Sequence, residues 1–199
     1  MEIGGVLLAA GRSSRTGSHH KLLAEFDGVP LIRKSAQTML HSRLSNIVAV
    51  VGYRSSDVEH ALRGLTLSIS YCDDFSMGMG VSLAHGFAHE SLRRCAGVLV
   101  MLADMPEVTS DHIDRLVDFF VRSGGEQVVR GSHGSHPGHP VIVPPFLYQR
   151  MRELRGDEGA RSVLRNADIT TQLVDLGRAA LSDVDTPCAV ASAGGILRS

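Results

Sequence analysis

Residues 3–21 read IGGVLLAAGRSSRTGSHHK, an apolar run that leads into glycines and cations. The run as far as position 10 has the length and composition of a strand buried on both faces, as in a parallel sheet. Gly11 and Gly17 let backbone amides approach an anion closely, and Arg15 and Lys21 add positive charge. Because α/β proteins bind ligands at the carboxyl ends of their strands, this loop is predicted to hold a triphosphate. It contains neither a P-loop nor a GxGxxG pattern, and an ordinary strand-to-helix turn is the alternative.

The rest of the chain alternates strand-like and helix-like segments with short connections, which favours a three-layer α/β fold with a mostly parallel sheet. Residues 1–190 are expected to form a single domain and residues 191–199 a loose tail. Ser56 to Glu59 form a predicted capping box at the start of one helix. Further strands are expected at 47–51, 67–71, 97–102, 127–130, 141–143 and 169–176, and helices at 30–44, 56–63, 81–92, 111–122, 146–154 and 160–166.

The composition excludes several classes of protein. A formal net charge of -1 over 199 residues argues against a nucleic-acid coat or a polybasic membrane anchor. No apolar run approaches the ~20 residues that cross a bilayer, and no basic segment of a signal peptide precedes the first strand. The three cysteines are far apart, so we expect no disulfide framework and a reducing, cytoplasmic compartment. Lys21 and Lys34 are the two lysines among 20 basic residues.

A second glycine-containing motif, SMGMGVSL, spans residues 76–83. Gly78 and Gly80 would bring the backbone close to a flat group, and Ser82 could donate a hydrogen bond to it while it begins a helix. A plain N-cap is the alternative role for Ser82.

Two motifs end apolar strands in carboxylates that are followed by proline. The first is LVMLADMP over residues 99–106, which places Asp104 where it can hold Mg²⁺ through oxygen. The second is DVDTP over residues 183–187, which contains Asp185. A turn or N-cap aspartate is the alternative for Asp104.

Histidines recur every third residue at His133, His136 and His139, which raises the question of a zinc site. The many glycines and prolines around them indicate an open loop, and no cysteine or fourth ligand is close in sequence, so metal binding is disfavoured there. His85 and His89 share a helix face but lack an HExxH pattern.

The segment LAAGRSSR, followed by Lys21 and then by GVPLI at 28–32, resembles the MobA-like nucleotidyltransferases. Within them it most resembles the molybdenum cofactor cytidylyltransferase (MocA-like) branch, because Ala10 stands where the guanylyltransferase branch has glycine. Thr16 replaces the usual methionine, and Cys188 begins a departure from the usual acidic pair. The motifs GMGVSL, LADMP, GHPV, GDEGAR and DVDTP follow in the order of the family.

This resemblance implies a Rossmann-like fold of the nucleotide-diphospho-sugar transferase type and a set of site residues. Arg15, Lys21 and Asp104 would be catalytic, and Asp104 and Asp185 would hold Mg²⁺ or Mn²⁺. The nucleotide would contact Leu8, Ala9, Ala10, Gly11, Arg12, Ser13, Arg15, Lys21, Gly78, Gly80 and Ser82. The acceptor would contact His139, Pro140, Gly156, Asp157 and Arg161.

The implied reaction is transfer of CMP from CTP to the phosphate of molybdopterin or molybdenum cofactor, with release of pyrophosphate. A molybdoenzyme or its maturation chaperone is an open further partner. Three alternatives remain: a related enzyme that uses GTP or ATP and another acceptor such as a sugar phosphate, a non-catalytic cofactor-binding accessory protein for a molybdoenzyme, and a nicotinamide dehydrogenase. The missing GxGxxG pattern disfavours the last.

Overall fold

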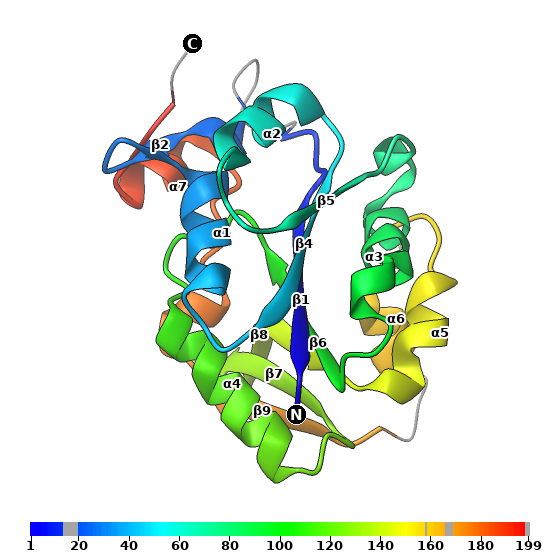
Figure 1. The fold of residues 1–199 in the computed structure, drawn as a ribbon. Coiled ribbons are helices and arrows are strands. Elements are labelled where there is room, and N and C mark those ends of the chain that lie inside the picture. The colour runs from blue at the N-terminus through cyan, green and yellow to red at the C-terminus, as the bar shows by residue number, and fades with distance from the viewer. Residues whose placement is uncertain (14–19, 158, 166–168, 198–199) are drawn as a thin grey trace.

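The computed structural model describes residues 1–13, 20–157, 159–165 and 169–197. A seven-stranded sheet runs through the molecule in the order β5-β4-β1-β6-β8-β7-β9 (Figure 1). All neighbouring strands are parallel except that β8 is antiparallel to both β6 and β7. The mostly parallel α/β prediction is therefore confirmed. The strands are β1 (Ile3–Ala9), β4 (Ser45–Val51), β5 (Ser68–Tyr71), β6 (Gly97–Leu102), β7 (Val128–His133), β8 (His136–Val143) and β9 (Thr171–Asp175).

Helices cover both faces of this sheet (Figure 1). Along β1, Leu7 and Ala9 pack into the core under α1, α2 and α4, whereas Val6 and the adjoining Ala10 pack into the core under α3, α5 and α6. Alternate side chains of a strand point to opposite faces, which explains why this run is apolar throughout. The helices are α1 (Leu31–Leu40), α2 (Ser55–Leu62), α3 (Met79–Ala88), α4 (Ser110–Arg122), α5 (Tyr148–Arg152), α6 (Ala160–Arg165) and α7 (Pro187–Ser192).

Short 3-10 turns connect several of these elements. They lie at Lys21–Leu23, Phe75–Met77, Glu90–Leu92, Pro145–Leu147 and Gly177–Ala180. Within the described ranges, no helix has both the length and the apolar character needed to cross a bilayer.

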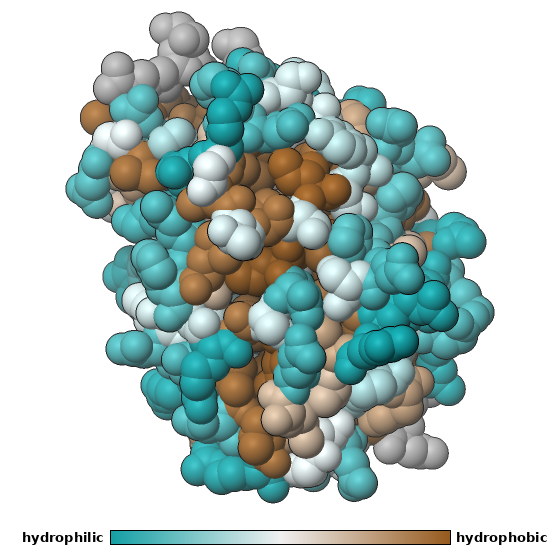
Figure 2. Space-filling model, in the orientation of Figure 1, coloured by the Kyte–Doolittle hydropathy of each residue, from teal (hydrophilic) through white to brown (hydrophobic). Residues whose placement is uncertain are grey.

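Figure 2 shows apolar side chains gathered down the middle of the face seen in Figure 1, between hydrophilic flanks. Strand β5 is the edge of the sheet there, and its residues are half-buried or exposed. Ile69 of β5 and the preceding Leu65 and Leu67 are partly buried against the core.

Three local predictions are wrong. Helix α2 begins at Ser55 without a side-chain cap, so Ser56 lies inside the helix, and Glu59 accepts a hydrogen bond from the Tyr71 hydroxyl instead (2.7 Å). Ser82 lies inside α3, which starts at Met79, so it is no N-cap. Residues 131–139 are not an open loop: β7 and β8 continue through them as a hairpin that pairs His133 with His136.

The carboxyl-terminal segment is part of the fold as far as it is described. Strand β10 (Gly195–Ile196) pairs antiparallel with β2 (Glu25–Phe26), which in turn pairs with β3 (Val29–Pro30). The prediction of a loose tail over 191–199 is therefore wrong for residues 191–196, because pairing with a distant hairpin leaves no local signal in the sequence.

This packing gives a test of the small sheet. A Cβ atom on Gly195 would lie 2.5 Å from the Phe26 ring, so Gly195→Val should overpack the junction and lower the free energy of unfolding by about 1–3 kcal/mol. Chemical denaturation measures this change. Ile196→Ala is the control, since the Ile196 side chain is 62% exposed and its truncation should be nearly neutral. A neutral Gly195→Val variant would show that the segment does not pack as described.

Candidate active site

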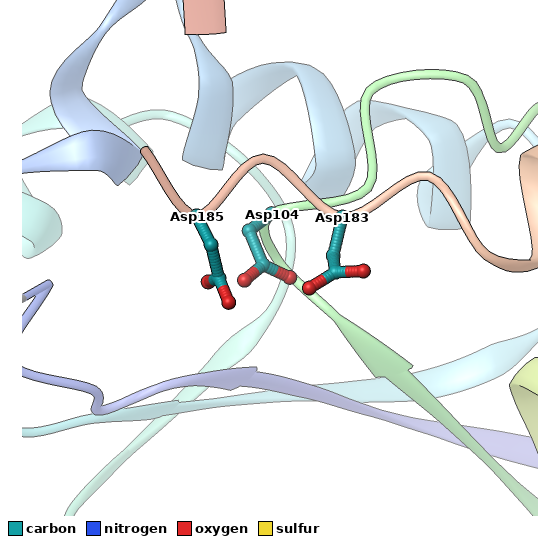
Figure 3. A group of neighbouring side chains, drawn as sticks. All are labelled: Asp104, Asp183 and Asp185. Atoms are coloured by element: carbon teal, nitrogen blue, oxygen red, sulfur yellow. The ribbon is translucent and has the colours of Figure 1, made fainter. Parts of the chain in front are cut away.

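Three carboxylates meet at the carboxyl edge of the sheet. Asp104 follows β6 directly, and the Ala103 amide donates to Leu8 at the end of β1 (3.1 Å), so the ends of these strands lie together. The Val184 amide donates to the Asp104 carbonyl (3.0 Å), which brings Asp183 and Asp185 alongside. Each carboxylate offers an oxygen, and these oxygens lie within 4.8 Å of one another. Figure 3 shows the three side chains pointing the same way from two adjacent segments.

Lys21 supplies positive charge to this cluster. Its Nζ donates to Asp104 Oδ2 and to Asp185 Oδ1, the latter at 2.6 Å. The Lys21 and Asp104 side chains are 13% and 14% exposed, so water screens the pair weakly. Burial lowers the pKa of Lys21, but the charges and hydrogen bonds of Asp104 and Asp185 outweigh it and raise that pKa overall. Lys21 is therefore protonated near neutral pH.

Asp104 has the environment of a ligand for a cation. Burial raises the pKa of its carboxyl, and the neighbouring ammonium of Lys21 opposes that rise. Its Oδ1 atom is buried and has no hydrogen-bond partner within the described part of the chain. Three carboxylates with one lysine leave an excess of negative charge, and carboxylate oxygens suit Mg²⁺ and Mn²⁺. The residues therefore fit a divalent cation.

Asp183 is the site residue that the sequence analysis did not assign. It stands two residues before Asp185, and alternate residues of an extended segment face the same side. That spacing was the available signal. The exposed Asp183 completes the group with Asp104 and Asp185.

A cavity of about 430 Å³ opens beside these carboxylates. Asp104, Asp183 and Asp185 all lie in its wall. It is also lined by seven of the predicted nucleotide-binding residues, namely Leu8, Ala9, Ala10, Gly11, Lys21, Gly78 and Ser82.

The remaining predicted nucleotide residues have other surroundings. The Arg12 guanidinium lies 5.5 Å from the centre of the Phe75 ring, and Phe75 itself lines the cavity. Ser13 adopts a left-handed backbone (φ 55°), and Gly80 donates to the Gly156 carbonyl (2.9 Å). Arg15 lies outside the described residues.

A second cavity of about 560 Å³ adjoins the first. Aliphatic side chains form most of its wall, with Arg130, His139 and Asp157 among the polar residues. The two cavities share five lining residues, Leu8, Met79, Leu102, Asp157 and Asp183. Two ligands bound side by side would therefore meet next to the carboxylates.

Only some of the predicted acceptor residues line this second cavity. His139 and Asp157 line it, whereas Pro140 is not among its lining residues. Gly156 packs against the loop of Gly78. Arg161 belongs to α6, and its side chain lies outside the described part of the structure.

The described structure does not bring the three histidines of the repeat together as a group of possible metal ligands. Across the described ranges, the three aspartates are the one group of three or more His, Cys, Asp or Glu side chains arranged to hold an ion. His133 and His136 oppose each other across the hairpin, and His139 faces the second cavity.

The fold and this site define the class of the protein as a nucleotidyltransferase. The chain belongs to the MobA-like NTP transferase domain family, whose profile matches residues 5–174.

Two curated relatives span nearly the whole chain. Purine catabolism protein PucB of Bacillus subtilis is 29% identical over 194 residues, which is 92% of this chain and 91% of PucB. Nicotine blue oxidoreductase of Paenarthrobacter nicotinovorans is 29% identical over 188 residues, with the same two coverages.

The fold is also that of Rv0371c from Mycobacterium tuberculosis, with a TM-score of 0.82, 22% identity and coverage of 98% of this chain and 97% of that one. Rv0371c has also been solved in complex with manganese.

The contact between the two glycine loops can be tested. Gly78 has a φ of 116°, and a Cβ there would lie 2.3 Å from the Gly156 backbone. Gly78→Ala should therefore cost about 1–3 kcal/mol and weaken nucleotide binding, because it forces apart the loops that border both cavities. Thermal unfolding and nucleotide titration measure the two effects.

Gly159→Ala is the matched control for this variant. The nearest neighbour of a Cβ atom added to Gly159 would be Met79 Sδ, at 3.9 Å. The stability of this variant should therefore stay near that of the wild type. Equal behaviour of the two variants would contradict the proposed loop contact.

Proposed function

We propose that the protein transfers CMP from CTP to the phosphate of molybdopterin or of the molybdenum cofactor and releases pyrophosphate. The observation that carries this proposal is the pair of adjoining cavities with shared Asp183 and Asp157 at their border. The first holds the predicted nucleotide residues, and the second is large enough for a ring-containing acceptor. Ala10, which lines the first cavity, supports cytidine through the motif of the cytidylyltransferase branch.

The reaction requires no strong acid or base from the protein. An oxygen of the acceptor phosphate, already anionic near neutral pH, attacks the α-phosphorus of CTP in line with the bond to the β-phosphate. The new P–O bond forms as the old one breaks, and pyrophosphate leaves with the electron pair. Catalysis then depends on positioning and on neutralising charge.

The protein's own residues would divide these tasks. The Lys21 ammonium, which lies between two carboxylates, would contact the phosphate oxygens when the triphosphate binds. Arg15 would add a second cation. Asp104, Asp183 and Asp185 would hold a divalent cation, which neutralises phosphate charge when bound. The aliphatic wall of the second cavity would orient the acceptor and exclude water.

One different function has specific support. A relative named as an oxidoreductase matches this chain over nearly its whole length, and the second cavity is largely aliphatic. Such a cavity would also accept a flat dye. Oxidation of NADH or NADPH in the presence of a dye, with no pyrophosphate release from CTP and acceptor, would favour that function and reject ours.

The assignment of Asp104 and Lys21 predicts large losses of turnover. Asp104→Asn and Lys21→Ala should each reduce pyrophosphate release by at least about 10²-fold, since both remove charge next to the reacting phosphates. Asp27→Asn and Lys34→Ala are matched controls, because Asp27 and Lys34 pair with each other on the surface at 3.7 Å. Near-normal turnover in either test variant would reject the role of that residue.

The base preference can be tested separately. Thermal unfolding with each of the four nucleoside triphosphates and Mg²⁺ should show the largest rise in Tm with CTP, because a ligand at 100 times its Kd adds about 2.7 kcal/mol. Equal shifts with all four would remove the preference for cytidine and leave the wider class of reaction intact.

Lys21 should also compete with the divalent cation. Its Nζ binds one oxygen of Asp104 and one of Asp185, two of the carboxylates that would hold such an ion. Calorimetric titration without nucleotide should therefore give tighter Mn²⁺ binding to Lys21→Ala than to the wild type, by about 10-fold, because a like charge is removed. Lys34→Ala should bind Mn²⁺ as the wild type does. Unchanged or weaker binding by Lys21→Ala would contradict this competition.

A further inference from the structure

His20 is a buried polar residue that touches no substrate cavity, yet it directly precedes Lys21. Its side chain is 3% exposed. Its Nδ1 accepts a hydrogen bond from the Leu22 amide (3.3 Å), so it caps the 3-10 turn Lys21–Leu23. Its Nε2 lies 3.3 Å from the Tyr53 carbonyl oxygen. The imidazole therefore connects two segments that are far apart in the sequence.

The ring adds a stacking contact to these hydrogen bonds. His20 and Tyr53 are stacked with centroids 5.6 Å apart and planes inclined by 10°. Tyr53 is itself fixed, because its amide donates to the Ala10 carbonyl at the end of β1 (3.2 Å). Through Tyr53, the turn of Lys21 is thus attached to the carboxyl ends of β4 and β1.

The partners of His20 define its protonation. An amide donates to Nδ1 and a carbonyl faces Nε2, which is the pattern of a neutral ring with its proton on Nε2. Burial lowers the pKa of His20, in agreement with the neutral form.

We propose that His20 is a positioning residue, which clamps the turn of Lys21 to the end of β4 and so holds the lysine ammonium at the carboxylate cluster. A lysine side chain has four rotatable bonds, and its reach is useful only when its Cα is fixed. Misplacement by about 1 Å at a reacting centre can cost about 10²-fold in rate. The proposal rests on the proposed function only in giving Lys21 a role at the nucleotide phosphates.

The fold does not depend on this clamp alone. Leu22 of the same turn is 3% exposed and belongs to the main core, which anchors the turn independently. Loss of the imidazole should therefore leave the protein folded with a displaced Lys21.

The test uses the scarcity of lysine in this chain. Protein labelled at lysine Cε and Nζ should give two side-chain NMR signals, one from Lys21 and one from Lys34, and the second serves as an internal control. His20→Phe keeps a stacking ring and removes both hydrogen bonds. It should shift the Lys21 signal and leave that of Lys34 unchanged. It should also weaken CTP binding by about 10-fold or more.

Conservative and surface variants complete the design. His20→Asn, whose side-chain oxygen can accept from the Leu22 amide, should recover most of the wild-type CTP affinity. His60→Phe makes the same substitution on the exposed surface of α2 and should change neither signal nor affinity. If His20→Phe fails to fold, His20→Ala and His20→Asn give the same comparison.

A double-mutant cycle separates positioning from general stability. In a Lys21→Ala background, His20→Phe should no longer reduce CTP binding, because the residue it positions is absent. An equal loss in both backgrounds, or an unshifted Lys21 signal, would overturn the proposal. The NMR signal requires neither acceptor nor turnover, so failure of the proposed reaction would leave this result intact and distinguishable.

Discussion

The ion cluster of Lys21 with Asp104 and Asp185 is the constraint on which the rest of the site depends. Bringing like-charged carboxylates together in a half-buried place is unfavourable unless a cation neutralises them. In this structure a lysine from the first connection of the chain does so. The parallel pairing of β1 with β6 makes that contact geometrically simple, because the segments after both strands emerge at one edge.

The border between the two cavities follows from the same arrangement. The Gly78 loop packs on the backbone of Gly156, so one wall serves the predicted nucleotide side and the predicted acceptor side at once. A side chain at position 78 would push the two loops apart and separate the two cavities from each other. The absence of a side chain at Gly78 is thus a requirement of the cleft as a whole.

Short-range patterns predicted most of the fold. The uninterrupted apolar run of β1 indicated a strand buried on both faces, and Asp104 was recognisable as a carboxylate at the end of such a strand. What the sequence did not reveal depends on distant partners. Asp183 gains its place from the hydrogen bond between Val184 and Asp104. The hairpin of β7 and β8 extends into residues rich in glycine and proline, where Gly131 and Ser132 pair with the distant strand β9.

The pairing of β10 with β2 has a consequence for folding during biosynthesis. The cluster combines residues 21, 104 and 185, so most of the sheet can form on the ribosome before its last carboxylates have been synthesised. The small sheet then pairs Gly195 with Phe26, and Phe26 lies a few positions after Lys21 in the chain. A chain interrupted before Asp183 would contain all seven strands of the main sheet but lack two of the three carboxylates. The completion of synthesis is thus linked to the completion of the charged site.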